Sequence, residues 1–310
     1  MSSLLDKRLI FVTGKGGVGK TTVATALGLL AARSGKRTIV CEVAQQERMS
    51  RVFRREGVGY HETELAERLF AISIDPQHAM EEYLRQQIKP GALYQLLFDN
   101  RIFQYFAAAA PGTREFLTIG KVWELAQLER RAAGTRPYDL VILDAPATGH
   151  GLGMLHTPAT MRDLARAGPI RNHADRVDKF VRDPKKTGVL VVALPEEMPV
   201  NETLELEEAL AEQMGMEIDA VVANGLYPER FNTKEAEQIE RVDGTHPVPA
   251  VAAALGAAHA QHVRARGQRS QLRRLRRAAA APVATLPFLF EPELSLESFE
   301  RLSLDLERKL

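Results

Sequence analysis

The stretch FVTGKGGVGKTT at residues 11–22 constrains this chain more than any other. It contains the pattern G-x-x-x-x-G-K-[ST], which follows an apolar run and precedes a helical pattern. Glycines in such a loop let successive backbone N–H groups turn inward and form an anion-binding concavity, and the helix N-terminus adds partial positive charge. The stretch therefore predicts a strand, a phosphate-binding loop and a helix, and with them a site for a nucleoside triphosphate.

The pattern assigns roles to individual residues of this loop. Lys20 is placed for the β- and γ-phosphates, and the Thr21 hydroxyl is placed for Mg²⁺. Lys15 is a second lysine, directly after the first glycine, that the pattern does not require. The residues expected to bind ATP in this loop are Gly14, Lys15, Gly16, Gly17, Val18, Gly19, Lys20, Thr21 and Thr22.

Along the rest of the chain, short apolar runs alternate with helical patterns. Strands are expected at 9–13, 37–43, 70–75, 139–145, 188–194, 219–224 and 283–290. Strands separated by helices imply right-handed crossover units and a mostly parallel, doubly wound α/β sheet that is covered on both faces. An apolar content of 45% in 310 residues supplies enough material for such a core.

One gap between the expected strands is too long for an ordinary connection. Strand character disappears from residue 76 to 137, and three helical patterns take its place. We interpret 76–137, with part of 151–187, as a helical subdomain inserted into a P-loop ATPase core formed by 1–75 and 138–310. Leucines and aromatic residues between Leu93 and Phe106 form an apolar stripe in this insertion, which predicts either ordinary core or a groove for an apolar client.

An acidic residue, Asp144, ends the strand expected at 139–145. At this position its carboxylate can hold Mg²⁺ directly or through a water molecule. An aspartate after a strand is otherwise a helix cap or a turn residue. The complete phosphate-binding loop upstream in the same expected sheet favours the metal-binding role.

Composition and charge exclude several classes of protein. With Cys41 as its one cysteine, the chain alone cannot form a disulfide, a C-x-x-C zinc site or a cysteine-ligated cluster. A net charge of +1 gives no argument for nucleic acid, and the arginines between 264 and 277 are interpreted as a solvated helix face. No apolar run approaches the roughly 20 residues of a spanning helix, and no signal segment is evident. We expect a cytoplasmic protein without zinc, nucleic acid or a membrane span.

Two motifs together resemble a known family. The loop GKGGVGKTT at 14–22 and the stretch DAPATGH at 144–150 are similar to those of the ArsA-type family, which contains arsenite-pump ATPases and tail-anchored-protein targeting ATPases with a deviant Walker-A loop. The resemblance covers nearly the whole chain, including the strand order and the helical insertion. It implies an ATP- and Mg²⁺-dependent hydrolase that cleaves a phosphoanhydride bond and acts as a dimer.

The resemblance also implies roles for single residues. The family's early lysine reaches the phosphates of the other subunit, and this role falls on Lys15. Asn224, after a late strand, and Pro287-Phe288, near the C-terminus, fall where the family holds adenine. Glu42 stands where the family has the aspartate that orients the attacking water, but the following proline and histidine are missing. The expected catalytic residues are Lys15, Lys20, Glu42 and Asp144, and the expected metal ligands are Thr21 and Asp144.

Three functions stay open at this point. The first is an ATPase, homodimeric or paired with a paralogous ATPase, that couples nucleotide state to the binding of a client membrane protein. The second is the energy-coupling subunit of an anion pump, although a single cysteine cannot supply the family's arsenite-binding cluster. The third is a non-hydrolysing structural partner of a paralogous ATPase, which the altered residue at Glu42 favours.

Overall fold

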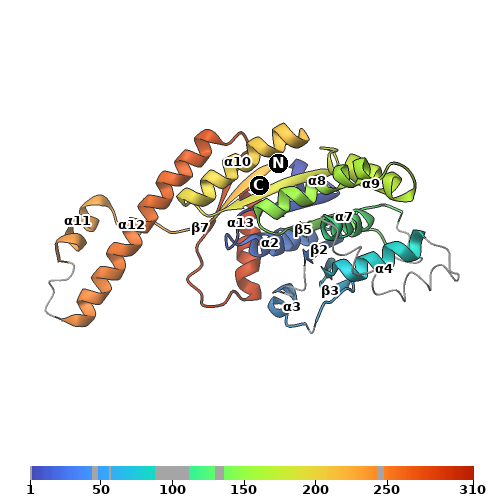
Figure 1. The fold of residues 1–310 in the computed structure, drawn as a ribbon. Coiled ribbons are helices and arrows are strands. Elements are labelled where there is room, and N and C mark those ends of the chain that lie inside the picture. Colours follow the sequence, from blue (N-terminus) through green and yellow to red (C-terminus); the bar gives the residue numbers. More distant parts are fainter. Residues whose placement is uncertain (1, 44–47, 56, 88–111, 130–135, 243–247) are drawn as a thin grey trace.

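The fold is built around an eight-stranded sheet. A computed structural model describes residues 2–43, 48–55, 57–87, 112–129, 136–242 and 248–310 (Figure 1). The strand order is β3-β4-β2-β5-β1-β6-β7-β8, and every neighbouring pair is parallel except β3 and β4. The strands are β1 (Leu9–Thr13), β2 (Thr38–Val43), β3 (Thr63–Ala66), β4 (Leu69–Ile74), β5 (Leu140–Asp144), β6 (Thr187–Ala193), β7 (Ala220–Leu226) and β8 (Val283–Pro287). The predicted α/β class and mostly parallel sheet are confirmed.

Helices cover both faces of this sheet, as expected for a doubly wound fold (Figure 1). Alternate residues of β1 show the two layers, because Leu9 and Phe11 pack into one apolar cluster while Ile10 and Val12 pack into the other. The first cluster includes side chains of α7, α9, α10 and α12, and the second includes side chains of α2 and α13. The helices are α1 (Ser2–Leu5), α2 (Lys20–Arg33), α3 (Arg48–Val52), α4 (Pro76–Gln87), α7 (Thr113–Leu125), α8 (Thr148–Leu164), α9 (Pro169–Val181), α10 (Glu197–Met214), α11 (Thr233–Val242), α12 (Pro249–Ala278) and α13 (Leu296–Lys309).

The structure differs from the sequence-based expectation at several elements, among them β8, which ends at Pro287 and not at 290. Strand β3 was not predicted, because its four residues pair only at the sheet edge and bury little side-chain surface. The helical part of 151–187 is two helices, α8 and α9, and α8 already begins at Thr148. Pro169 marks the new start, because proline suits the first turn of a helix.

Between β4 and β5 the structure describes the helices α4 and α7. The apolar stripe from Leu93 to Phe106 lies outside the described residues. The division of the chain into a core and an inserted helical subdomain therefore stays a prediction. None of the described helices combines the length and apolarity that a bilayer span requires.

The C-terminal helix α13 is amphipathic and packs against α2. Ser295 and Ser298 form a capping box at its start. Arg33 of α2 then donates hydrogen bonds to Ser303 at 2.8 Å and to Glu307 at 2.5 Å. This packing fixes α2, and with it the helix N-terminus that follows the phosphate-binding loop.

Candidate nucleotide-binding site

The loop at 14–19 joins the central strand β1 to α2, at the carboxyl edge of the sheet. Strands β5 and β6 flank β1, and β2 lies on the far side of β5. Open parallel sheets bind ligands in this position, outside the carboxyl ends of strands whose connections run to opposite sides. The fold therefore gathers Glu42 from β2 and Asp144 from β5 at the edge that carries the loop.

At two positions of the loop, no residue other than glycine fits the backbone conformation and the available space. Gly14 and Gly19 have φ angles of 144° and 90°, which L side chains rarely adopt. A Cβ atom at Gly14 would overlap the backbone carbonyl oxygen of Val192. A Cβ atom at Gly19 would overlap the side-chain nitrogen Nδ2 of Asn224. The backbone needs these two residues to follow the path that turns its N–H groups inward.

Lys20 lies over the loop that it follows. Its Nζ donates to the carbonyl oxygens of Gly14 at 3.1 Å and Lys15 at 3.0 Å. Burial lowers the pKa of Lys20, and the negative charge of Asp144 acts in the opposite direction. An ammonium group held in this way is available to phosphate oxygens that enter the concavity.

Thr21 and Asp144 meet at the first turn of α2. The Thr21 hydroxyl donates to Asp144 Oδ2 at 2.5 Å, and Asp144 Oδ1 is buried with no hydrogen-bond partner among the described residues. Burial raises the pKa of Asp144 to about 6, although the Thr21 hydroxyl and Lys20 favour its charged form. A hydroxyl beside an unpaired carboxylate oxygen suits Mg²⁺, which prefers oxygen ligands. The residues predicted to bind metal are thus brought together.

Glu42 lies directly beside Asp144 in the sheet, because the two residues are paired in the β2–β5 register. Its Oε1 accepts backbone N–H groups of Arg48 at 2.9 Å and Met49 at 3.4 Å, at the start of α3. Its Oε2 is buried with no hydrogen-bond partner in the described part of the chain. Burial raises the pKa of Glu42 to about 6, and the nearby charge of Asp144 adds to this effect.

The Lys15 side chain reaches α10. Its Nζ forms an ion pair with Glu202, a residue that the sequence analysis did not select. Both side chains keep about a third of their surface exposed, at 35% and 29%. No local motif marks Glu202, which is one of several glutamates in α10, so only the packing of α10 beside the loop reveals it.

The residues predicted to hold adenine lie at the ends of β7 and β8. Asn224 donates from Nδ2 to the Val18 carbonyl oxygen at 2.9 Å, so it supports the phosphate-binding loop directly. Pro287 pairs with Leu226 in the sheet. Phe288 is 38% exposed and stacks on Tyr227 with ring centroids 4.5 Å apart. Tyr227 was not predicted, because a lone aromatic residue after a strand carries no signal of its own.

The stretch after Asp144 leads straight into α8. Gly151 packs so closely on the end of β1 that a Cβ atom there would lie 2.6 Å from Thr13 Oγ1. Thr13 Oγ1 is itself buried without a hydrogen-bond partner among the described residues. The side chains of Thr148 and His150 lie outside the described residues. The start of α8 is thus in contact with the strand that carries the phosphate-binding loop.

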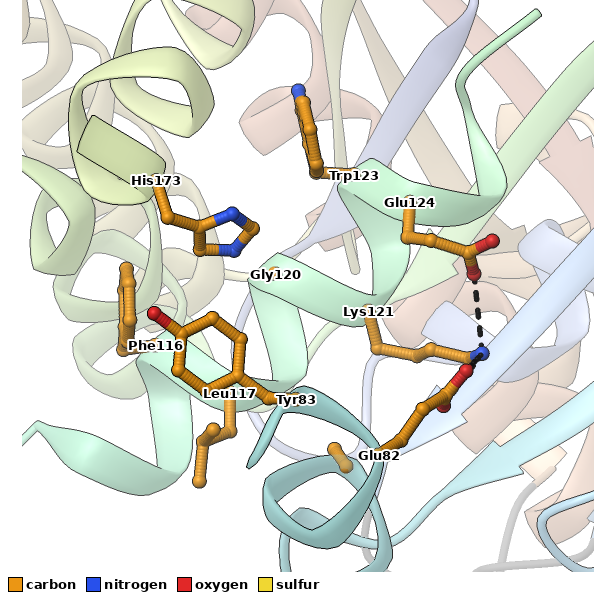
Figure 2. A pocket seen from close by; sticks show the side chains of 10 residues that line it. Glu82, Tyr83, Phe116, Leu117, Gly120, Lys121, Trp123, Glu124 and His173 are labelled. Atoms are coloured by element: carbon orange, nitrogen blue, oxygen red, sulfur yellow. Dashed lines mark hydrogen bonds and ion pairs between the residues drawn. The ribbon is translucent and has the colours of Figure 1, made fainter. Parts of the chain in front are cut away.

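A hollow lies away from this edge, between α4, α7 and α9 (Figure 2). In Figure 2 the rings of Tyr83, Phe116 and Trp123 surround the imidazole of His173, with ring centroids 5.1 to 5.8 Å from it. The cavity is about 30 Å³, which is room for a few water molecules. This hollow is therefore a packed joint between helices, too small to hold a client segment.

A buried ion-pair network adjoins the same joint. Lys121 of α7 pairs with Glu82 of α4 at 2.8 Å and with Glu124 at 3.1 Å, and its side chain is only 9% exposed (Figure 2). These neighbours raise the pKa of Lys121 against the effect of its burial. Tyr60 also donates to Glu82, at 2.7 Å. Charge pairs of low exposure fix α4 to α7 in one arrangement, since breaking such a pair leaves a buried charge uncompensated.

Comparison with known proteins places this geometry in a family. A family profile described as "Anion-transporting ATPase" matches residues 7–167 and 169–245. The ATPase BagA of Mycobacterium tuberculosis is 32% identical over 240 residues, which cover 76% of this chain and 69% of that protein. A putative arsenical pump-driving ATPase of Halobacterium salinarum is 29% identical over 79% of this chain and 41% of its own length. The ATPase GET3 of Podospora anserina is 30% identical over 52% of this chain and 47% of its own length.

Proposed function

Because the chain belongs to the ArsA-type family of anion-transporting ATPases, we propose that it binds and hydrolyses ATP at the edge formed by β1, β2 and β5. The observation that carries the proposal is the meeting of Thr21 and Asp144 at 2.5 Å beside Lys20 and the glycine-shaped loop. These groups come from two separate motifs, 123 residues apart, and have the chemistry that a metal–triphosphate complex requires.

Each group has a distinct task in this proposal. The loop backbone and Lys20 bind the phosphates, and Thr21 and Asp144 would hold Mg²⁺, which supplies charge neutralisation at the β- and γ-phosphates. Glu42 accepts a hydrogen bond from the attacking water through Oε2, which has no hydrogen-bond partner among the described residues. Asn224 holds the loop from behind by its bond to Val18, and Phe288 with Tyr227 offers an aromatic face to the base.

Lys15 acts in a dimer in this proposal. The Lys15 ammonium is paired with Glu202 of α10 in the isolated chain. In a nucleotide-bound dimer the lysine would leave Glu202 and contact the phosphates of the partner's ATP. An exposed ion pair of this kind is worth at most about 1 kcal/mol, so the contact does not prevent that exchange.

The nucleotide edge is coupled to the helices between β4 and β5 through α8. The start of α8 packs on Thr13, and its length packs against α7, α9 and α10. The joint at His173 and the network at Lys121 then tie α7 to α9 and α4 (Figure 2). A movement of α8 that follows the state of the γ-phosphate would therefore shift this group of helices together. We propose that this movement controls the binding of a client or partner protein.

A second candidate is a non-hydrolysing partner of a paralogous ATPase. The observation that favours it is the engagement of Glu42 Oε1 with the backbone of α3, which leaves one carboxylate oxygen for water. Steady-state turnover of the purified chain separates the two candidates. ATP binding without turnover supports the structural partner, and Mg²⁺-dependent turnover supports the ATPase.

The site assignment is tested by Lys20→Ala and Lys15→Ala. Lys20→Ala should lower ATP affinity about 100-fold or more in a calorimetric titration, because the bound phosphates lose their central cation. Lys15→Ala should keep wild-type affinity in the same titration and lose hydrolysis and nucleotide-dependent dimerisation. Unchanged affinity in Lys20→Ala would contradict the site, whereas wild-type turnover in Lys15→Ala would contradict only the role across the dimer.

A further inference from the structure

Two neighbouring helices carry charges of opposite sign. Helix α10 has six glutamates and no lysine or arginine, and α12 has seven arginines and no acidic residue. The C-terminal half of α12 lies beside α10, and the two helices are in contact (Figure 1). We call the exposed Glu205, Glu208 and Glu212 the acidic stripe, and the exposed Arg266, Arg273 and Arg277 the basic stripe.

Both stripes point away from the sheet on the same side of the molecule. Leu206 and Leu210 of α10 and Leu272 and Leu275 of α12 are buried in the same apolar cluster. Because these residues face the sheet, the opposite sides of both helices face outward. Spacings of three, four and seven residues keep each stripe on one side of its helix. The two stripes therefore form one outer surface of mixed sign.

Within the described part of the chain, the charges of the stripes are not neutralised. Among the described residues, no hydrogen bond or ion pair is made by any of the six side chains of the stripes. Charges on the inner sides of the same helices are satisfied, since Glu207 accepts the backbone N–H of Ala281 at 3.1 Å and Arg269 pairs with Glu229 at 2.8 Å. The difference shows that these helices can pair their charges, and that the outward stripes remain available to another molecule.

We propose that these stripes form a self-association surface whose occupant is a second copy of this chain. A two-fold axis that runs parallel to the helices and between them lays each acidic stripe on the partner's basic stripe. Such an interface uses the same patch on both subunits, as closed dimers do. An anionic membrane or a nucleic acid would attract the basic stripe, but the adjacent acidic stripe would repel it, so a second copy fits the whole surface better.

None of the six stripe residues belongs to the proposed nucleotide site, although Glu205 lies one turn of α10 from Glu202, so the proposal does not depend on ATP. Association through it should be present in nucleotide-free protein and should weaken as salt rises, because exposed charges are screened over about 10 Å at 0.1 M ionic strength. Individually, exposed ion pairs contribute little, but several pairs in register on both sides of the axis act together.

Charge reversal tests the proposal, with association measured by sedimentation velocity in nucleotide-free, low-salt buffer. The triple variants E205K/E208K/E212K and R266E/R273E/R277E should each raise the dissociation constant about tenfold or more, because each presents a surface of one sign to its own copy. An equimolar mixture of the two variants should associate at least as tightly as the wild type, because the two surfaces then have opposite signs throughout. A shared folding defect cannot produce that rescue.

A matched control reverses charges on the opposite face of the sheet. E297K/E300K in α13 should self-associate like the wild type. Three outcomes would overturn the proposal: a monomeric wild type in low salt, unchanged association in both triple variants, or no rescue in the mixture. Binding of the wild type to vesicles containing an anionic phospholipid, lost only in R266E/R273E/R277E and without any self-association, would assign the basic stripe to a membrane instead.

Discussion

Two buried carboxylates of the same edge, Asp144 and Glu42, differ in what holds them. They are paired in the β2–β5 register, and burial raises the pKa of each to about 6. Asp144 is held by the Thr21 hydroxyl of the phosphate-binding helix, whereas Glu42 is held by the backbone N–H groups of α3. Equal burial therefore does not give the two carboxylates equal functions. Asp144 contacts Thr21 at the proposed metal position, and Glu42 contacts the chain segment that follows β2.

The largest effect is expected from Asp144→Asn. Hydrolysis should fall about 100- to 1000-fold, because the amide cannot supply the negative charge that the metal position requires. Stability without nucleotide should rise by several degrees in melting temperature. The folded-state pKa of Asp144 is raised to about 6 from 3.8, so its stabilising contribution is present below about pH 4 and is lost as pH rises through 6. At pH 7.5 the buried charge costs about 3 kcal/mol, which asparagine removes.

Activity assays and thermal melts at pH 7.5 test whether Asp144→Asn lowers hydrolysis and raises the melting temperature. The exposed Glu217→Gln is the matched control and should leave both unchanged. A destabilised Asp144→Asn would show that the carboxylate is structural and would remove the contrast with Glu42.

An intermediate effect is expected from Glu42→Gln. Turnover should fall about 10- to 100-fold with ATP affinity unchanged, because glutamine keeps the bond from Arg48 but has no anionic oxygen for the attacking water. Glu42→Asp should recover part of the turnover. Equal losses in Glu42→Gln and Asp144→Asn, both with weakened nucleotide binding, would mean that the two carboxylates act as one metal site.

A smaller effect is expected from acidification. Both carboxylates must be ionised in the proposed roles, and burial raises the pKa of each to about 6, so turnover should fall as pH drops from 7 to 5. Neighbouring groups titrate as a pair, so the wild-type decline should be steeper than a one-proton curve. In Glu42→Gln, the fall in turnover should follow a one-proton curve. A decline as steep as that of the wild type would mean that a group other than Glu42 takes up the second proton.

Much of this edge could be predicted from the sequence, because its parts obey local rules. The glycine loop, the buried strands and the acidic strand ends each carry a short pattern, and a parallel sheet brings carboxyl ends to one edge. The sequence did not indicate Glu202, Tyr227 or the start of α8 at Thr148, because these features depend on packing between segments far apart in the chain. The apolar stripe from Leu93 to Phe106 remains a prediction, since it lies outside the described residues.

The smallest effect is expected from Glu202→Gln. Removing this charge releases Lys15 from its ion pair, so nucleotide-dependent dimerisation should strengthen by less than about fivefold. Sedimentation with and without a non-hydrolysable ATP analogue measures the change, and Glu217→Gln again serves as the control. Weaker dimerisation would instead show that Glu202 positions Lys15 for the partner subunit.

The most direct test of the proposed site is ATP turnover by the purified wild-type chain with Mg²⁺ and with the metal removed by a chelator. Saturable hydrolysis should disappear on metal removal and return when Mg²⁺ is added, and Asp144→Asn should be slower than the wild type by about 100-fold or more. ATP hydrolysis that continues without the metal, or that proceeds at the wild-type rate in Asp144→Asn, would contradict the proposed site.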